Sequence, residues 1–230
     1  MTGAAESPLV KVCGLTRTED VVLAAELGAW ALGFVFAPSP RRVTAEQVLP
    51  LVAAAREFPG RRPLAVGVFG DATPEAIVAV VEAAELDAVQ LHGSEPSARA
   101  VRTALGARAR DVLIIQAIPV PAAGAVDANL RAAVATAREA ADFLLFDTHS
   151  NRRFGGTGTP FPWALAHEVA GGEPFLVAGG IAPHNARQAL EATGAWGVDV
   201  SSGVESSPGI KDGNLLRALF AAVPSEGRRI

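Results

Sequence analysis

Short apolar runs and longer amphipathic stretches alternate eight times along this chain, and this alternation limits the folds that it can adopt. The short runs are rich in Val, Leu, Ile and Phe, whereas the longer stretches are rich in Ala, Leu and Glu. This pattern is typical of repeated βα units, in which a buried strand is followed by a surface helix. We expect the strands at Leu9 to Gly14, Ala31 to Phe36, Pro63 to Phe69, Ala88 to Gly93, Val112 to Val120, Asp142 to Asp147, Pro174 to Gly180 and Trp196 to Gly203.

Several of these runs are apolar at every position, as in Leu113-Ile114-Ile115 and Phe143-Leu144-Leu145-Phe146. Such strands are covered on both faces, which is typical of a parallel sheet with helices packed outside it. Eight consecutive units without a break in composition favour closure into a single (βα)8 barrel, an α/β fold, over residues 1–230. Residues 1–8 are expected to form a flexible N-terminal extension. An open doubly wound sheet is the alternative.

Three helix starts carry local signals. Thr44 precedes a long Ala-, Val- and Leu-rich stretch, and Thr73 stands before Pro74. Glu95-Pro96 also places a proline in an expected first turn, where its missing N–H costs nothing.

Composition excludes several functional classes. The formal net charge is −4, from 20 Lys and Arg against 24 Asp and Glu, without a long run of either sign, so nucleic acid is not an expected partner. The single cysteine, Cys13, excludes an internal disulfide and a Cys-cluster zinc site, and it favours a reduced, cytoplasmic setting. Neither a secretory signal nor a run of about 18 apolar residues is present, so we expect no membrane association.

In such barrels the active site lies where the strands end, so the polar residues that finish each apolar run are the candidates. They comprise one thiol, two carboxylates, one histidine, one guanidinium and two glycine-rich turns. They lie in the segments Lys11-Val-Cys13-Gly14, Ser39-Pro40-Arg41, Gln90-Leu-His92-Gly93, Asp147, Gly179-Gly180 and Asp199-Val-Ser-Ser202-Gly203.

Longer motifs surround these strand ends. They are Lys11-Val-Cys-Gly-Leu-Thr16, Gly33-Phe-Val-Phe36 with Ser39-Pro-Arg41, Val89-Gln-Leu-His-Gly93, Phe146-Asp147 with Gly155-Gly-Thr-Gly158, Ala178-Gly-Gly-Ile-Ala-Pro-His-Asn185, and Asp199-Val-Ser-Ser-Gly-Val-Glu205 with Pro208-Gly-Ile-Lys-Asp212. Together they resemble the motifs of phosphoribosylanthranilate isomerase, the isomerase of the third step in tryptophan synthesis. They run in order over nearly the whole chain, so the resemblance is specific.

The resemblance implies an Amadori rearrangement. N-(5-phosphoribosyl)anthranilate becomes 1-(2-carboxyphenylamino)-1-deoxyribulose 5-phosphate. A general acid protonates the furanose oxygen as the ring opens to an imine, and a general base removes the proton from the sugar C2. The chemistry requires no metal, redox cofactor or covalent carrier. The small-molecule substrate is then the only partner implied, and the protein could be a monomer or a homodimer.

The resemblance implies that Cys13 is the general base, although a free cysteine is more often a small buried hydrophobe. Alternation places Lys11 and Cys13 on the same face of the first strand, so both should point into the barrel. A neighbouring ammonium would lower the pKa of the Cys13 thiol toward the working pH. Lys11 could instead pair with an inward carboxylate.

The resemblance implies that Asp147 is the general acid, whereas a strand-terminal Asp can also simply cap the next turn. Asp147 shares its inward parity with Phe143 and Leu145. Apolar surroundings should raise the pKa of its carboxyl group, which helps it to donate a proton.

Two glycine-rich turns after the last two expected strands suit a phosphate, because their N–H groups and the following helix dipole can face the anion. The alternative is that glycine only makes a tight turn there. The expected phosphate ligands are Gly179, Gly180, Ser202 and Gly203, together with Gly156 in a glycine-rich loop that we interpret as a lid. Lys211 is expected to be solvated.

Four further residues are expected to bind the substrate. Arg41 should bind the aryl carboxylate, and we expect it across the barrel mouth from the last two strands. Arg42 is the alternative ligand, and either arginine could instead be a solvated loop residue. Gln90 and His92 share inward parity and are expected to line the pocket, and the alternative interpretation is a hydrogen-bonded core histidine. Asp199 also points inward, toward either a sugar hydroxyl or Lys11.

Two other functions remain as alternatives to this interpretation. The related isomerase of histidine synthesis, or a bifunctional enzyme, typically uses two aspartates, whereas the first strand here offers Cys13. A non-catalytic barrel that binds a phosphorylated metabolite would not need a matched acid and base. A metal-dependent hydrolase is disfavoured because no expected strand end has a His-X-His motif.

Overall fold

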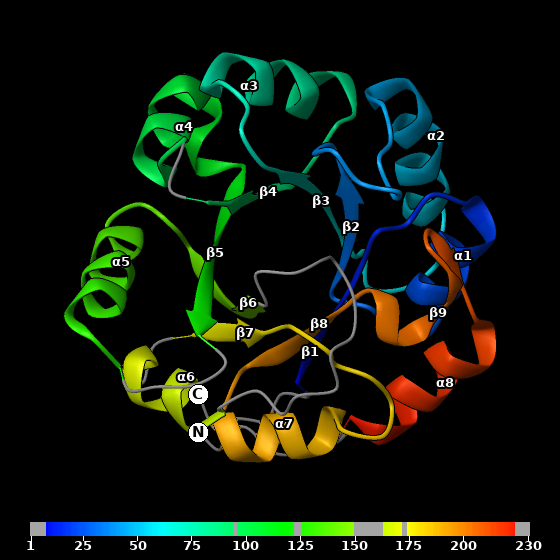
Figure 1. Cartoon of the computed structure of the whole chain (residues 1–230). Coiled ribbons are helices and arrows are strands. Elements are labelled where there is room, and N and C mark those ends of the chain that lie inside the picture. Colours follow the sequence, from blue (N-terminus) through cyan, green and yellow to red (C-terminus); the bar gives the residue numbers. More distant parts are fainter. Residues whose placement is uncertain (1–7, 94–95, 122–125, 150–162, 172–173, 224–230) are drawn as a thin grey trace, which may run out of the picture.

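Eight parallel strands close into a barrel in chain order (Figure 1). The computed structural model describes residues 8–93, 96–121, 126–149, 163–171 and 174–223. The strands are β1 (Leu9–Cys13), β2 (Ala31–Val35), β3 (Leu64–Phe69), β4 (Ala88–His92), β5 (Leu113–Pro121), β6 (Phe143–His149), β7 (Phe175–Val177) and β8 (Gly197–Val200). The expected (βα)8 barrel is thus confirmed and the open sheet is excluded. Residues 1–7 of the expected extension lie outside the described residues.

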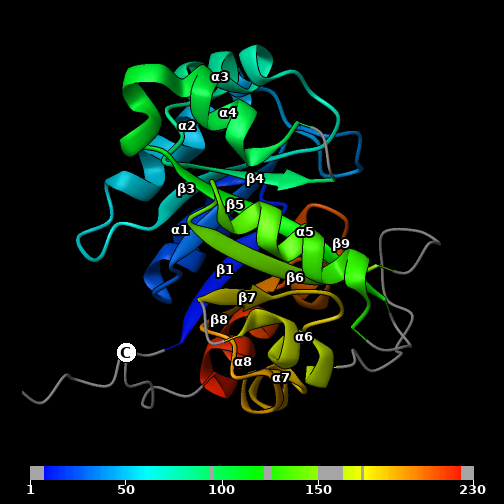
Figure 2. The same ribbon diagram turned by 90° about the vertical axis from the view of Figure 1, so that its left-hand side faces the viewer.

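The helices surround the barrel and cover its outer face (Figures 1 and 2). They are α1 (Thr18–Glu26), α2 (Ala45–Arg56), α3 (Pro74–Ala83), α4 (Ala98–Leu105), α5 (Ala128–Arg138), α6 (Trp163–Ala170), α7 (Ala186–Thr193) and α8 (Gly213–Ala222), with short 3-10 turns at η1 (Gly106–Arg110) and η2 (Ser202–Val204). None of the described helices has the length and apolar character needed to cross a membrane.

Two of the three expected helix starts are confirmed. The hydroxyls of Thr44 and Thr73 each accept the backbone N–H three residues further on, and Pro74 follows at the first helical position. The third expectation is wrong, because α4 begins only after Ser97, whose side chain caps the helix. Pro96 therefore lies before the cap and not within the first turn.

Strand alternation produces two apolar layers. Outward side chains pack against the helices, and inward side chains form a smaller cluster inside the barrel. Trp30 and Phe143 pack against this inner cluster near the strand starts, with ring centroids 5.2 Å apart. The amino-terminal half of the interior is therefore filled by apolar groups, and the inward polar residues follow along the same strands toward their carboxyl ends.

A hairpin that the sequence analysis did not anticipate follows β8. Its strands β9 (Glu205–Ser207) and β10 (Ile210–Lys211) are antiparallel. Thr16 Oγ1 donates to the Gly209 carbonyl at 2.6 Å, and the Lys211 N–H donates to Asp20 Oδ2 at 3.0 Å. These bonds fasten the segment after the last barrel strand to the segment after the first.

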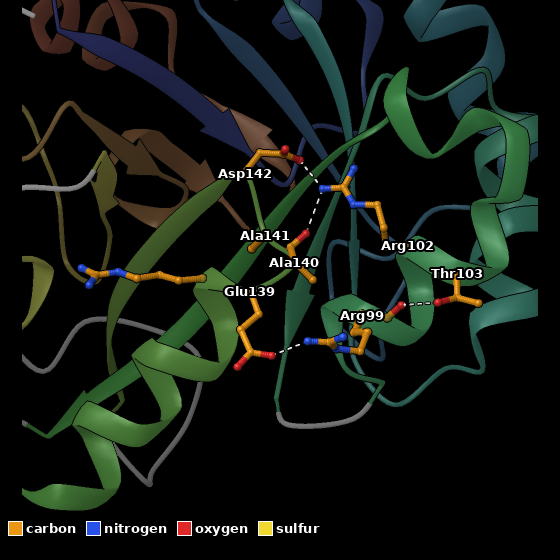
Figure 3. Close-up of a pocket in the computed structure, with 8 residues that line it drawn as sticks. Arg99, Arg102, Thr103, Glu139, Ala140, Ala141 and Asp142 are labelled. Carbon is orange, nitrogen blue, oxygen red and sulfur yellow. Dashed lines mark hydrogen bonds and ion pairs between the residues drawn. The ribbon is translucent and has the colours of Figure 1, made fainter.

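A hollow between α4 and α5 lies at the opposite end of the barrel (Figure 3). It borders Asp142, which directly precedes β6, so it belongs to the end where the strands begin. Arg102 donates to Asp142 Oδ2 at 2.6 Å and to the Ala140 carbonyl at 2.9 Å. Arg99 pairs with Glu139. Because these charges hold neighbouring units together, the hollow has a structural role and is not the functional site.

Candidate functional site

The first and last barrel strands bring charged groups together in the interior. Lys11 on β1 lies opposite Asp199 on β8, and Lys11 Nζ donates to Asp199 Oδ1 at 2.9 Å. Lys11 is completely buried, and Cys13 has the same inward parity and is also buried. The expected orientation of both side chains is confirmed. Of the two interpretations of Lys11, pairing with an inward carboxylate is the one observed.

Gly33 on β2 provides the space that Cys13 and Lys11 occupy. It lies opposite Cys13 in the sheet. A Cβ atom added at Gly33 would lie 2.8 Å from Cys13 Sγ and 3.1 Å from Lys11 Nζ, closer than side chains normally approach. The absence of a side chain at this position therefore allows the thiol and the ammonium group to lie side by side.

The Cys13 thiol is less acidic than the sequence suggested. Burial raises the pKa of Cys13, and the nearby charge of Lys11 lowers it without offsetting the effect of burial. The expectation of a lowered pKa is therefore wrong. The physical reason is burial of the thiol, which outweighs the Lys11 charge, and the negative charge of Asp199, the partner of Lys11, raises the pKa of Cys13 further. Burial also lowers the pKa of Lys11, but Asp199 and Cys13 raise it above its ordinary value, so Lys11 stays protonated.

Asp147, near the end of β6, lies in the same electrostatic environment. Burial raises the pKa of its carboxyl group from 3.8 to about 6, with a further rise from Asp199 and an opposing effect of Lys11. The direction expected from its apolar surroundings is confirmed. Near neutral pH this carboxyl group can exchange a proton, which an ordinary surface aspartate cannot do efficiently.

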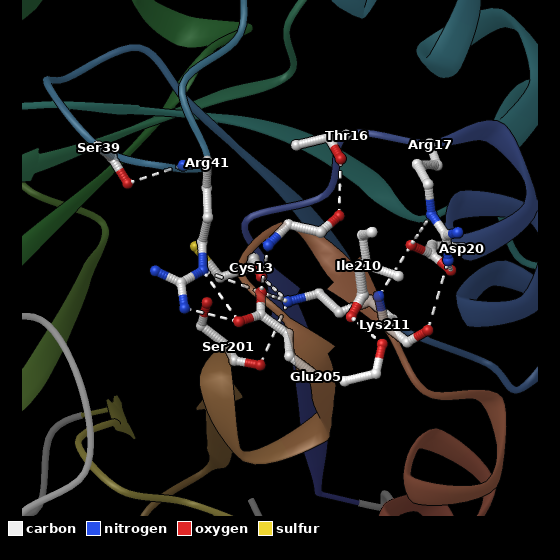
Figure 4. Close-up of polar contacts among 12 residues, drawn as sticks. Cys13, Thr16, Arg17, Asp20, Ser39, Arg41, Ser201, Glu205, Ile210 and Lys211 are labelled. Carbon is white, nitrogen blue, oxygen red and sulfur yellow. Dashed lines mark hydrogen bonds and ion pairs between the residues drawn. The ribbon is translucent and has the colours of Figure 1, made fainter.

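Arg41 reaches from the loop after β2 to Glu205 of the β9–β10 hairpin (Figure 4). Its Nε donates to Glu205 Oε1 at 2.9 Å and its Nη2 donates to Oε2 at 2.6 Å. Arg41 is 9% exposed, whereas the neighbouring Arg42 is exposed. Arg41 does not lie across the mouth from the last strands as expected, because only β1 separates β2 from β8 in the closed barrel.

Lys211 is buried, and the expectation that it would be solvated is wrong. The hairpin carries it into the barrel mouth, where its Nζ donates to Glu205 Oε1 at 2.8 Å. The same group donates to the carbonyls of Cys13 at 2.6 Å and Ser201 at 3.2 Å. Burial lowers the pKa of Lys211, and Glu205 and Cys13 oppose that effect.

Gln90 and His92 lie together on β4. Gln90 is buried, and its Nε2 lies 2.6 Å from His92 Nε2. The buried Gln90 Oε1 has no hydrogen-bond partner within the described part of the chain. A buried acceptor without a partner is unfavourable, so a ligand that donates to it would be stabilised.

The two glycine-rich turns are in contact with each other. Gly179 and Gly180 have positive φ angles of 86° and 68°, which other residues rarely adopt. A Cβ added at Gly203 would lie 2.0 Å from the Ile181 carbonyl oxygen, so only glycine allows the turns after β7 and β8 to approach this closely. Ser202 is exposed beside them. Gly156 and the rest of the 155–158 loop lie outside the described residues.

Glu205 is the main residue of this site that sequence reasoning left without a role. Its carboxylate accepts hydrogen bonds from Arg41, Lys211 and the Gly209 N–H, and those partners together with burial determine its ionisation. Burial raises the pKa of Glu205, but Arg41 and Lys211 lower it below the ordinary value. The signal that the sequence offers for this role is the pair of opposite charges at Glu205 and Lys211 within one motif.

These features define a class of protein. A closed (βα)8 barrel that brings a thiol and a carboxyl group of raised pKa into one interior, beside two touching glycine turns, is a barrel enzyme of the acid–base type. Among the residues that the structure describes, no group of three His, Cys, Asp or Glu side chains is placed to hold a metal ion.

Comparisons with known proteins identify the family. The model of the N-(5'phosphoribosyl)anthranilate (PRA) isomerase family matches residues 10–222. The curated N-(5'-phosphoribosyl)anthranilate isomerase of Rubrobacter xylanophilus is 40% identical over 220 residues, which cover 94% of this chain and 98% of the relative. The crystal structure of phosphoribosyl anthranilate isomerase from Thermus thermophilus has a TM-score of 0.75 and 38% identity, covering 93% of this chain and 97% of that one.

Two further solved structures bear on ligands and assembly. One is a phosphoribosyl anthranilate isomerase in complex with reduced 1-(o-carboxyphenylamino)-1-deoxyribulose 5-phosphate, with a TM-score of 0.75 and 32% identity, over 94% of this chain and 98% of that one. The other shows monomers generated from a dimeric isomerase of Thermotoga maritima, with a TM-score of 0.75 and 31% identity, over the same shares.

The chain belongs to the N-(5'-phosphoribosyl)anthranilate isomerase family. Its activity is the isomerisation of phosphoribosylanthranilate to 1-(2-carboxyphenylamino)-1-deoxyribulose 5-phosphate in tryptophan biosynthesis. Membership of this family favours this activity over the histidine-pathway isomerase and over the non-catalytic binding barrel.

Proposed function

We propose that Cys13 and Asp147 are the base and the acid of this isomerisation. Asp147 in its protonated form donates its proton to the furanose oxygen, and the C–O bond breaks as the nitrogen lone pair forms the protonated imine of the open chain. Cys13 in its thiolate form then removes the proton from C2, which gives an enolamine that tautomerises to the ketone. The observation that carries the proposal is the raised pKa of about 6 of Asp147 in an interior that also holds Cys13 and Lys11.

The pKa values imply an uncommon distribution of protons. With the pKa of Asp147 at about 6 and that of Cys13 above its ordinary value, the neutral thiol and the carboxylate predominate at pH 7. The reactive form carries the same net charge, with one proton moved from Cys13 to Asp147. Its fraction is therefore constant between the two pKa values and small throughout. Lys11 supports this form because its ammonium favours the thiolate.

The two anionic groups of the substrate, the aryl carboxylate and the phosphate, each need a partner at the barrel mouth. Arg41 would bind the aryl carboxylate, and the touching turns at Gly179, Gly180, Ser202 and Gly203 would bind the phosphate with their N–H groups. We assign Gly156 to the same phosphate site on sequence grounds alone. A complex with the reduced product would place the phosphorus atom beside these turns, and a phosphate elsewhere would refute this assignment.

The remaining polar groups of the interior would orient the sugar. The unpartnered Gln90 Oε1 can accept from a sugar hydroxyl, with His92 beside it. Asp199 mainly balances the charge of Lys11, and it has further acceptor capacity for a hydroxyl group. These residues supply positioning and do not themselves need to transfer a proton.

We propose that the protein acts as a monomer or a homodimer, and a solved relative from Thermotoga maritima is dimeric. The reaction needs Cys13 in its reduced form, which fits the cytoplasmic setting that we propose.

The pH dependence of kcat/KM tests the acid–base assignment. We expect a plateau whose lower limb falls off below about pH 6, because protonation of Asp147 in addition to the thiol leaves no base. Its upper limb should report the raised pKa of Cys13. A lower limb near pH 4, the ordinary range of an aspartate, would contradict the role of a buried Asp147.

A further inference from the structure

Glu205 lies at the centre of a buried charge cluster that the acid–base chemistry does not use. Its side chain is 4% exposed and contacts two cations, Arg41 and Lys211. The contacts to Arg41 run from Nε and Nη2 only, along one edge of the guanidinium (Figure 4). Arg41 itself has five N–H donors in a fixed plane. The outer edge, formed by Nη1 and the second hydrogen of Nη2, is not used by these bonds.

We propose that Glu205 is the positioning residue for Arg41, and that it directs the Nη1–Nη2 edge of the guanidinium toward the aryl carboxylate of the substrate. The inference rests on the proposed role of Arg41. Because Glu205 occupies the Nε–Nη2 edge of the guanidinium, only the Nη1–Nη2 edge remains available to the ligand. It also holds the long side chain in one conformation before the substrate arrives, which reduces the entropy cost of binding.

Lys211 links this arrangement to the barrel. Its Nζ donates to the carbonyl of Cys13, the last residue of β1, and to the carbonyl of Ser201, which directly follows β8. The same Nζ also donates to the Glu205 carboxylate. A continuous series of hydrogen bonds therefore connects the ends of β1 and β8 to Lys211, then to Glu205 and then to Arg41. A shift of Glu205 would move the anion-binding edge relative to Cys13.

The charge balance of the cluster supports the same role. Two cations and one carboxylate leave one net positive charge in the wall of the mouth, which matches one aryl carboxylate. Without Glu205, two cations would share a largely buried site, which is unfavourable. With a second acidic group, the wall would be neutral and would attract the substrate less. A single carboxylate therefore keeps the cations in place and leaves charge for recognition.

Glu205→Gln is the direct test. Glu205 accepts through both oxygens, so an amide in either orientation points its NH2 group at Arg41 or Lys211. We expect KM to rise about tenfold or more, with kcat within a few-fold of wild type. The reduced product 1-(o-carboxyphenylamino)-1-deoxyribulose 5-phosphate should lose inhibitory affinity by a similar factor. Its phenylamino analogue without the carboxylate should bind both proteins equally.

Asp20→Asn is the matched control. Asp20 is buried and holds the same hairpin through the Lys211 N–H, but its hydrogen bonds do not involve Arg41. If Glu205 only fastened the hairpin, both variants would raise KM alike, and the proposal would be wrong. Equal loss of affinity for the two inhibitors in Glu205→Gln would overturn it as well.

A double variant separates this inference from the role of Arg41. If Arg41→Ala raises KM, Glu205→Gln should add little in that background, whereas independent, additive effects would contradict positioning. If Arg41→Ala leaves KM unchanged, Arg41 does not bind the aryl carboxylate, and both its proposed role and its positioning by Glu205 are wrong. Should Glu205→Gln not fold, Glu205→Asp keeps the charge but is one methylene shorter, and we expect it to raise KM as well. A wild-type KM in Glu205→Asp would show that the exact position of the carboxylate does not matter, and it would refute the positioning of Arg41 by Glu205.

Discussion

Gly33→Ala should reduce catalysis although residue 33 takes no part in the chemistry. The added methyl group would lie 2.8 Å from Cys13 Sγ, 3.0 Å from Cys13 Cα and 3.1 Å from Lys11 Nζ. Carbon atoms in contact prefer separations of about 3.5–4.0 Å. The thiol must therefore move by roughly 0.7 Å, and the β1 backbone by about 0.5 Å. Both Cys13 and Lys11 would leave the geometry that the native glycine allows.

The expected magnitude follows from these displacements. A misplacement of about 1 Å in a reacting group can cost about 10²-fold in rate, so kcat should fall by about 10- to 100-fold. Overpacking a tight interior should also lower the free energy of unfolding by about 1–3 kcal/mol. The change in kcat should exceed the change in KM, because the methyl group contacts Cys13 and Lys11 directly, whereas Arg41 is linked to Cys13 only through Lys211 and Glu205.

The assay is steady-state turnover followed by the fluorescence change of the anthranilate aminosugar, together with urea unfolding. Gly67→Ala is the matched control. A Cβ there would lie 2.6 Å from Leu86 Cδ1 and 2.7 Å from Phe69 Cε2, so it also overpacks a strand glycine but on the helix-facing side. Both variants should lose stability, and only Gly33→Ala should lose kcat. If kcat falls equally in the two variants, or in neither, the reasoning about Cys13 is wrong.

Two further predictions concern Arg41 and Asp147. Arg41→Ala should raise KM substantially while exposed Arg42→Ala stays close to wild type, and equal effects in a parallel kinetic comparison would remove the special role of Arg41. Asp147→Asn should be inactive yet more stable above pH 7. A carboxyl whose pKa is 3.8 when unfolded and about 6 when folded binds more protons in the folded state, so stability falls as pH rises through that window. The variant should thus gain at most about 3 kcal/mol in the free energy of unfolding at pH 7.5 and nothing at pH 3.5, whereas a gain that does not vary with pH would contradict the raised pKa.

The positions of the inward side chains were predictable because β-strand alternation is a local rule. The parity of Lys11 with Cys13, and of Gln90 with His92, follows directly from it. The touching turns after β7 and β8 were also expected, since consecutive strands of a closed barrel are neighbours.

The energetics of the site were harder to predict because they depend on partners far apart in the sequence. Burial raises the pKa of Cys13, and Asp199, which pairs with Lys11 from 188 residues away, raises it further against the opposing effect of Lys11. Lys211 is buried because the hairpin that turns at Pro208-Gly209 folds back on β1, and a turn signal does not specify where a hairpin packs. Alternation gives the direction of a side chain, but it does not reveal which of several charges becomes its partner.

We propose that Cys13 removes the C2 proton while Asp147 opens the ring. A single-turnover measurement with substrate deuterated at C2 is the most direct test of this assignment. Wild-type enzyme should show a primary isotope effect when C–H cleavage limits the rate. Cys13→Ala should react at least about 10²-fold more slowly, with the isotope effect retained and substrate affinity within a few-fold of wild type. A Cys13→Ala rate close to wild type, with the isotope effect still present, would contradict the assignment of the base.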